Sequence, residues 1–127
     1  MVVDSSAIVA IAMLEPGSDP LVQKALSVPC IVASPTLLEA HIVLRSRLGS
    51  QATIFLDQLI FKIRAEILPF GEQHLREACL AFDRYGKGRH PAGLNFGACM
   101  SYALAKNSGQ PLLYVGDDFP KTDLMSA

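Results

Sequence analysis

The 127-residue sequence predicts an α/β domain, with helices on both faces of a mostly parallel sheet. Short apolar runs typical of buried strands alternate with longer segments in which apolar residues recur at helical spacing. Half of the residues are hydrophobic and 18% are charged, which excludes a disordered chain. The length suits one domain with its own core. We therefore expect a single three-layer α/β/α domain over residues 1–127.

The first half of the chain is predicted from cap residues and breakers. Residues 1–4 are expected to form a strand, and Ser5 or Ser6 to cap a helix that ends before Pro16 and Gly17. Two later helices should begin with a cap residue and a proline, and a strand should lie between them. These elements are a helix from Asp19-Pro20 to about residue 27, a strand at 31–33, and a helix from Ser34-Pro35 to about residue 48.

The second half continues the alternation of helices and strands. A helix is expected over residues 51–64 with a stripe of Ile54, Phe55, Leu59 and Ile63, followed by a strand at 66–69. A helix over 72–85 should place Leu75, Ala78, Cys79 and Phe82 on one face. The basic, glycine-rich segment 86–93 is expected to be a loop. The last elements are a helix over 94–107, closed by Ser108-Gly109, and a strand at 112–115.

Composition narrows the class of protein further. The N-terminus has no basic region, and the longest apolar run, residues 8–14, is too short to span a bilayer, so we expect a cytoplasmic protein. Cys30, Cys79 and Cys99 lack metal-binding spacing and are expected to be reduced core thiols. A net charge of −1 provides no general attraction for nucleic acid. Any RNA contact would need a local basic patch, for which residues 87–90 are the one compact candidate.

Four carboxylates stand where apolar segments end or are interrupted, namely Asp4, Glu39, Asp117 and Asp118. Asp4 and the Asp117-Asp118 pair follow predicted strands, and ligands gather at the carboxyl ends of strands in open parallel sheets. An aspartate like Asp4 can equally be a helix cap, and Gly-Asp-Asp alone can be an ordinary turn.

Glu39 shares a predicted helix face with Ile42, Val43 and Ser46, so its carboxylate should lie toward the interior. A carboxylate there needs a partner or a metal, and the alternative to a metal is an ion pair with Arg45 or Arg47.

Convergence of Asp4, Glu39 and Asp118 at one edge of the sheet would produce an all-oxygen site suited to Mg²⁺ or Mn²⁺. Such a site can activate water and stabilise a phosphodiester transition state. Asn95 at a helix N-terminus could position a phosphate or serve simply as the cap. Lys87 and Arg89 could hold an RNA backbone or belong to a solvated loop.

Several segments together resemble the PIN-domain ribonucleases, most closely the VapC-type toxins of bacterial toxin–antitoxin pairs. The resemblance runs nearly end to end and lies in residues 1–7 (Met-Val-Val-Asp-Ser-Ser-Ala), 38–40 (Leu-Glu-Ala), 85–97 (the long middle motif that ends Leu-Asn-Phe-Gly) and 112–124.

The resemblance implies that Asp4, Glu39 and Asp118, or Asp117 in its place, are catalytic and metal-site acids, with Mg²⁺ or Mn²⁺ as the cofactor. It makes Ser6 the small hydroxyl residue beside the first acid. It further implies an endoribonuclease that acts on RNA, a homodimer, and a cognate VapB-type antitoxin that enters the acidic groove. We expect the antitoxin also to cover apolar helix surface near Leu44 and Ile54, and we expect no membrane partner for this protein.

This chain departs from the family motif at Ala98, where the family has aspartate. Loss of a hard anionic ligand should cripple hydrolysis and leave the fold intact, because alanine is an excellent helix former. A substitution introduced to silence a toxin and natural degeneration are the two explanations, and the completeness of the other motifs favours the first. The alternative function is a catalytically dead module that binds RNA or antitoxin. A haloacid-dehalogenase-like phosphatase is disfavoured because Ser6 stands where it needs a second acid.

Overall fold

The computed structural model describes residues 1–127 and has a four-stranded sheet at its centre. The strands are β1 (Val2–Val3), β2 (Ile31–Ala33), β3 (Glu66–Leu68) and β4 (Leu112–Leu113). They lie in the order β3-β2-β1-β4, and all three pairings are parallel. Parallel neighbours place their carboxyl ends at one edge of the sheet, which is where the functional-site candidates were predicted.

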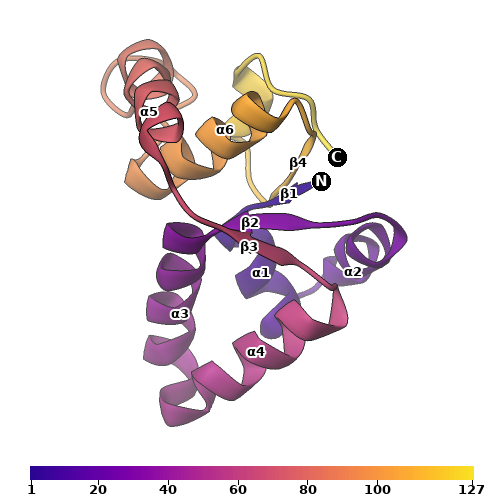
Figure 1. Cartoon of the computed structure of the whole chain (residues 1–127). Helices are drawn as coiled ribbons and strands as arrows, with labels where there is room; N and C mark the ends of the chain where they lie inside the picture. Colours follow the sequence, from indigo (N-terminus) through magenta and orange to yellow (C-terminus); the bar gives the residue numbers. More distant parts are fainter.

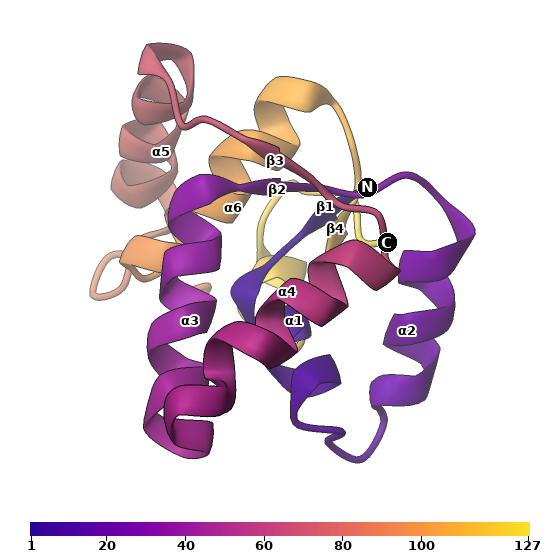
Figure 2. The ribbon, with the colours of Figure 1, turned by 60° about the horizontal axis from the view of Figure 1, so that its bottom comes forward.

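Six helices cover the two faces of this sheet (Figure 1). They are α1 (Ser5–Ala12), α2 (Ser18–Ser27), α3 (Ser34–Leu48), α4 (Ala52–Lys62), α5 (Glu72–Tyr85) and α6 (Phe96–Ser108). Figures 1 and 2 show α5 and α6 on one face and α1, α3 and α4 on the other. The predicted three-layer α/β/α fold with a parallel sheet is therefore confirmed.

The sheet separates two hydrophobic cores, and β1 contributes to both. Val2 packs into the core beneath α5 and α6, whereas Val3 packs into the core beneath α1, α3 and α4. Successive side chains of a strand point to opposite faces, so a strand buried on both sides must be apolar at every position. This requirement explains the unbroken apolar run that begins the chain.

The N-terminal ends of the first three helices differ from the prediction. Asp4, not Ser5 or Ser6, caps α1, because its carboxylate accepts the backbone N–H of Ser6. Helix α2 begins at Ser18 after Gly17, whose φ of +85° suits glycine, so Asp19 lies inside the helix. Helix α3 already includes Ser34, and no side chain caps it. A run of residues that can all serve as caps does not identify the one that does.

Other boundaries are shifted by one to three residues. The first and last strands are confined to two residues each, α1 ends at Ala12, and α6 begins at Phe96 after the cap residue Asn95. A 3₁₀ turn at Gly49–Gln51 precedes α4, which ends at Lys62. Helix α5, by contrast, has the predicted bounds.

Two predicted apolar stripes are only partly buried. In α4, Ile54 and Phe55 are exposed, and the helix packs through Ala52, Leu56 and Leu59. In α5, Leu75, Cys79 and Phe82 are exposed, and the helix buries His74, Ala81 and Tyr85. Periodicity identifies an apolar face, but the neighbouring elements decide how much of it is covered.

The two edges of the sheet are finished differently. Outside β4, Ser126 forms a parallel bridge with Leu112, and the N–H of Ala127 donates to the carbonyl of Leu112. The outer edge of β3 has no neighbouring strand. None of the helices has both the length and the apolar character needed to cross a membrane.

Candidate functional site

A small pocket of about 140 Å³ lies at the carboxyl edge of the sheet. Four segments that are distant in the sequence converge on it. Its lining residues are Asp4, Ser5, Ser6, Glu39, Asn95, Ala98, Val115, Asp118 and Phe119. The structure thus brings together six residues singled out from the sequence: Asp4, Ser6, Glu39, Asn95, Ala98 and Asp118.

Asp4 lies directly after β1 and is 4% exposed. One carboxylate oxygen accepts the hydroxyl of Ser6 at 2.6 Å and the N–H of Ser6 at 3.0 Å. The other accepts the hydroxyl of Ser101, a residue of α6, at 2.6 Å. The oxygen of Ser101 lies 3.5 Å from that of Thr36 in α3. Asp4 is therefore both a helix cap and a pocket residue, held by donors that allow a buried carboxylate.

Glu39 reaches the pocket from the side of α3. It is half-buried, and the hydroxyl of Ser5 donates to one of its oxygens at 2.5 Å. The fully buried residues of α3 are Thr36, Ala40 and Leu44. Of the residues predicted to share an interior face with Glu39, Ile42 and Ser46 are exposed, so the prediction is wrong for them, whereas Val43 packs partly against the core.

Neither of the two arginines considered as partners of Glu39 pairs with it. Arg47 instead contacts Glu15 at 3.3 Å, and Arg45 is exposed and forms no ion pair. The carboxylate of Glu39 therefore faces the pocket without a cationic partner, which is the situation that favours a metal or an incoming cation.

The N-terminus of α6 closes the pocket against Glu39. A Cβ atom at Gly97 would overlap the carboxylate of Glu39, so glycine lets this carboxylate lie directly against the helix. Asn95 caps the helix by accepting the N–H of Ala98 at 2.9 Å, which fulfils the cap alternative. Ala98 lines the pocket but provides no ligand atom.

The last acid comes from the segment after β4. Asp117 and Asp118 are both exposed, but only Asp118 lines the pocket. The N–H of Val115 donates to the hydroxyl of Ser6 at 3.0 Å, which ties this segment to the start of α1. Ser6 thus links Asp4 to the segment that carries Asp118.

The same C-terminal segment is fixed a few residues later by Asp123. Its carboxylate accepts Lys106 Nζ and the Tyr102 hydroxyl, both at 2.6 Å. These bonds from Lys106 and Tyr102 hold the pKa of Asp123 below its ordinary value. Burial and the bond to Asp123 raise the pKa of Tyr102. The position of Asp118 therefore depends on anchors provided by α6.

The basic loop lies outside the pocket. Lys87 and Arg89 are exposed and do not line it, and the guanidinium of Arg89 lies 5.7 Å from the ring centroid of Phe82. The structure therefore does not join these two residues to the acids.

Three pocket-forming residues, Ser5, Gly97 and Ser101, were not predicted from the sequence. Ser101 is one helical turn after Ala98, so position 98 could have indicated it. Gly97 and Ser5 gave no local signal, because their roles depend on contacts with a glutamate in another helix.

The pocket contains oxygen donors of the kind that a divalent metal requires. The oxygens of Asp4, Glu39 and Asp118 are the hard ligands that Mg²⁺ and Mn²⁺ prefer. However, no three His, Cys, Asp or Glu side chains are arranged to hold a metal ion. Both oxygens of Asp4 and one of Glu39 also accept serine hydroxyls. The residues present therefore do not complete a metal site.

Comparison with known proteins gives one consistent result. The family model described as PIN domain matches residues 1–124. The chain is 44% identical over 126 residues to VapC ribonuclease Mb2004c of Mycobacterium bovis and to ribonuclease VapC36 of Mycobacterium tuberculosis, covering 98% of this chain and 91% of each relative. It is 42% identical over 125 residues to ribonuclease VapC of Mycolicibacterium smegmatis, covering 98% of this chain and 97% of that one.

A solved structure shares the same fold. The crystal structure of Mycobacterium tuberculosis VapC20, described as a toxin that cleaves the sarcin–ricin loop, superposes with a TM-score of 0.79. The match covers 99% of this chain and 97% of the other at 14% sequence identity. At that identity the likeness concerns the fold alone.

Proposed function

The chain belongs to the PIN-domain family, among the VapC ribonucleases, and from this premise we propose that it is a VapC-type toxin whose metal-dependent RNA cleavage is impaired by Ala98. The observation that carries the proposal is the pocket in which Asp4, Glu39 and Asp118 lie around a position without a ligand atom. We take residues 1–127 to form one PIN domain.

The proposed roles follow from the positions of the side chains. Asp4, Glu39 and Asp118 would be the acids of a Mg²⁺ or Mn²⁺ site, and such an ion supplies charge stabilisation and an activated water for phosphodiester hydrolysis. Asp118 is preferred to Asp117 because it alone of the pair lines the pocket. Ser6 orients Asp4, and Asn95 fixes the helix end beside the pocket.

The proposed loss of RNA cleavage follows from what Ala98 lacks, namely the negative charge and the metal ligand of a carboxylate. A divalent ion that loses a carboxylate loses charge compensation as well as a ligand, and both oxygens of Asp4 and one of Glu39 already accept serine hydroxyls. The fold does not need a charged residue at this position, because the first turn of α6 is capped by Asn95.

The proposed partners are RNA and a cognate VapB-type antitoxin, and the proposed location is the cytoplasm. Lys87 and Arg89 are exposed and free to contact an RNA backbone. A homodimer is also part of the proposal.

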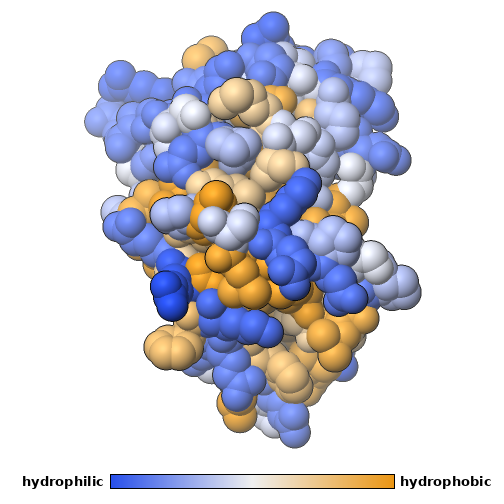
Figure 3. Space-filling model, turned by 90° about the vertical axis from the view of Figure 1, so that its right-hand side faces the viewer, coloured by the Kyte–Doolittle hydropathy of each residue, from blue (hydrophilic) through white to orange (hydrophobic).

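The antitoxin would cover apolar helix surface as well as the acidic pocket. On the side shown in Figure 3, hydrophobic residues gather in the middle and lower parts of the surface, whereas the upper part is mostly hydrophilic. Ile54 is exposed and available for such a contact, but Leu44 is fully buried and is not, contrary to the expectation for that position.

Restoring aspartate at position 98 tests the proposal directly. Ala98→Asp and the original chain would be incubated with a structured RNA and either Mg²⁺ or Mn²⁺, and the products would be separated by size. We expect metal-dependent cleavage by Ala98→Asp that is at least about a hundredfold faster than by the original chain, the order of loss that removal of one transition-state contact produces.

Two matched variants separate the proposal from its rival. Ala98→Asn adds similar bulk without charge and should remain inactive, and Asp4→Asn combined with Ala98→Asp should abolish the recovered cleavage. If Ala98→Asp binds RNA but never cleaves it, the chain is a binding module that has lost catalysis beyond position 98.

A further inference from the structure

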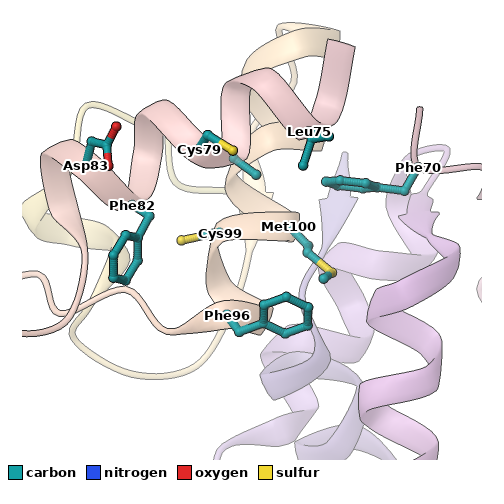
Figure 4. A pocket seen from close by; sticks show the side chains of 9 residues that line it. Phe70, Leu75, Cys79, Phe82, Asp83, Phe96, Cys99 and Met100 are labelled. Atoms are coloured by element: carbon teal, nitrogen blue, oxygen red, sulfur yellow. The ribbon is translucent and has the colours of Figure 1, made fainter. Parts of the chain in front are cut away.

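The largest mainly apolar groove on the α5–α6 face lies outside the acidic pocket and has no assigned role. It has a volume of about 300 Å³, and its lining is apolar except for Asp83. Helices α5 and α6 form its two walls, and Figure 4 shows side chains from both walls pointing into it. Two of the three cysteines of the chain, Cys79 and Cys99, are among these side chains.

The two thiols differ in access to solvent. Cys79 is exposed on α5, whereas Cys99 is only 5% exposed on α6. Figure 4 shows both sulfurs in the space between the helices. Burial raises the pKa of Cys99, and the neighbouring Cys79 raises it further, so the accessible Cys79 is the thiol expected to react with peroxide first.

We propose that Cys79 and Cys99 form a reversible, intramolecular disulfide that links α5 to α6 when the protein meets a peroxide. Peroxide needs an accessible thiol, and the sulfenic acid that it forms condenses with a second thiol nearby, which suits a pair with one exposed and one sheltered member. The proposal concerns a modification site separate from the acidic pocket and does not depend on the proposed function.

The reaction proceeds in two steps that balance. Hydrogen peroxide oxidises the accessible Cys79 thiol to sulfenic acid, and one water leaves with the other peroxide oxygen. The Cys99 thiol then gives up its proton, the resulting thiolate attacks the Cys79 sulfur, the S–O bond breaks, and the departing hydroxide takes up the proton and leaves as a second water. Two thiols have lost two electrons and two protons in total, and peroxide has accepted them. A dithiol reductant reverses the change by thiol–disulfide exchange.

The bond would act on the helix that closes the acidic pocket. Cys99 directly follows Ala98, and the same helix end carries Gly97 against Glu39 and the cap residue Asn95. A link between the middle of α5 and the first turns of α6 would restrain that end and narrow the apolar groove. Oxidation at an exposed surface is thereby transmitted to the pocket through one helix.

Cys30 provides an internal control. It is 2% exposed, belongs to the core on the opposite face of the sheet, and its thiol donates to the carbonyl of Ala25. It neither lines the groove nor offers a surface for peroxide, so it should stay reduced under conditions that oxidise the other pair.

Peptide mapping of the full chain tests the proposal. Purified protein freed of reductant would be treated with hydrogen peroxide, its remaining thiols alkylated, and the protein digested with trypsin. Cleavage after Arg76, Arg84, Arg89 and Lys106 releases Cys79 and Cys99 in separate peptides, residues 77–84 and 90–106. We expect these two peptides joined by a disulfide, loss of two of the three free thiols, and recovery of both by dithiothreitol.

Serine variants of the three cysteines distinguish the Cys79–Cys99 disulfide from other oxidation products. Cys30→Ser should leave the joined peptides unchanged, and Cys79→Ser, a substitution at an exposed site, should abolish them without affecting the fold. Cys99→Ser should leave a sulfenic acid on Cys79 that a 1,3-dione reagent captures. Joined peptides only between two chains, or oxidation of Cys79 with Cys99 still free in the original chain, would overturn the proposal.

Discussion

The carboxylate of Glu39 occupies the space in which a side chain at Gly97 would lie. The two residues come from α3 and from the first turn of α6, and their contact sets one wall of the acidic pocket. Glycine is an unfavourable helix residue, so its presence at this position reflects the need for space.

Gly97→Ala should therefore displace the Glu39 carboxylate, which is the end of a flexible side chain and can swing away at the cost of its hydrogen bond from Ser5. That loss, about 0.5–1.5 kcal/mol in the free energy of unfolding, offsets the better helix propensity of alanine, so the net change should be small. Urea denaturation measures it. In a Glu39→Ala background there is no carboxylate to displace, and the same substitution should stabilise the protein by up to about 1 kcal/mol. An effect of equal size in both backgrounds would contradict this explanation.

Divalent-metal binding should depend on position 98. Titration calorimetry with Mn²⁺ should detect weak or no binding to the original chain and an affinity at least about tenfold higher for Ala98→Asp, because a carboxylate adds both charge and a ligand. Ala98→Asn, which adds a neutral oxygen, should recover much less. Equal affinities for all three proteins would mean that position 98 lies outside the metal shell.

Ser101 should be needed to hold Asp4 in place. Ser101→Ala removes a 2.6 Å hydrogen bond to a buried carboxylate and should cost about 1.5–3 kcal/mol in the free energy of unfolding. Ser108→Ala is the matched control on the same helix, because Ser108 is exposed and should change stability by no more than about 0.5 kcal/mol. Similar losses for both variants would show that Asp4 does not need this donor.

The anchor at Asp123 should make stability depend on pH. The folded pKa of Asp123 lies below its ordinary value of 3.8, because Lys106 and Tyr102 donate to the charged form. At pH values near 3.8 and down to the folded pKa, Asp123 therefore binds fewer protons in the native state than in the unfolded state. Its contribution should be complete above pH 3.8 and should be lost as the pH falls through the folded pKa.

Unfolding of the original chain and of Asp123→Asn across this range checks the prediction. The original chain should be the more stable at neutral pH, and the difference should shrink in acid. Asp57→Asn, at an exposed aspartate without an ion pair, should show a much smaller difference at every pH. A difference in stability between the original chain and Asp123→Asn that persists at the lowest pH would contradict the proposed role of Asp123.

An arginine of the proposed antitoxin should bind the acidic pocket. Asp4, Glu39 and Asp118 line it without a cationic partner, and a guanidinium stays charged and can bind a carboxylate through two donors. Replacing that arginine by alanine should weaken the complex by roughly 2–5 kcal/mol, and added salt should weaken the original complex. A complex with no basic residue near Asp4 or Glu39, and with affinity insensitive to salt, would refute this mode of inhibition.

The α/β alternation could be predicted because each element carries its own signal. Buried strands are apolar at every position, and α5 lies between a glycine at each end, so its bounds were found correctly. The start of α1 was not, because Asp4, Ser5 and Ser6 can all cap a helix and only the tertiary structure selects among them. The exposure of the apolar face of α5 could not be predicted for a related reason. The spacing of its apolar residues is visible in the sequence, but how much of that face is buried depends on where α6 lies.

The acids of the pocket could be predicted from the sequence, whereas the residues that hold or make room for these acids could not. Acids at the ends of apolar runs are visible in a sequence, and Asp4, Glu39, Asp118 and Ala98 do line one pocket. Ser101 acts on a residue 97 positions away, and Gly97 is explained only by a side chain of another helix. Their importance comes from contacts that no local pattern encodes.

The order in which the pocket residues occur along the chain has a consequence for the protein during its synthesis. Asp4 and Glu39 leave the ribosome before position 98, and position 98 leaves it before Asp118. The pocket cannot assemble until the segment after β4 has been made and has bonded to Ser6. A nascent polypeptide that has not reached this segment lacks the complete set of acids, so any activity that needs all of them must wait until the segment has left the ribosome.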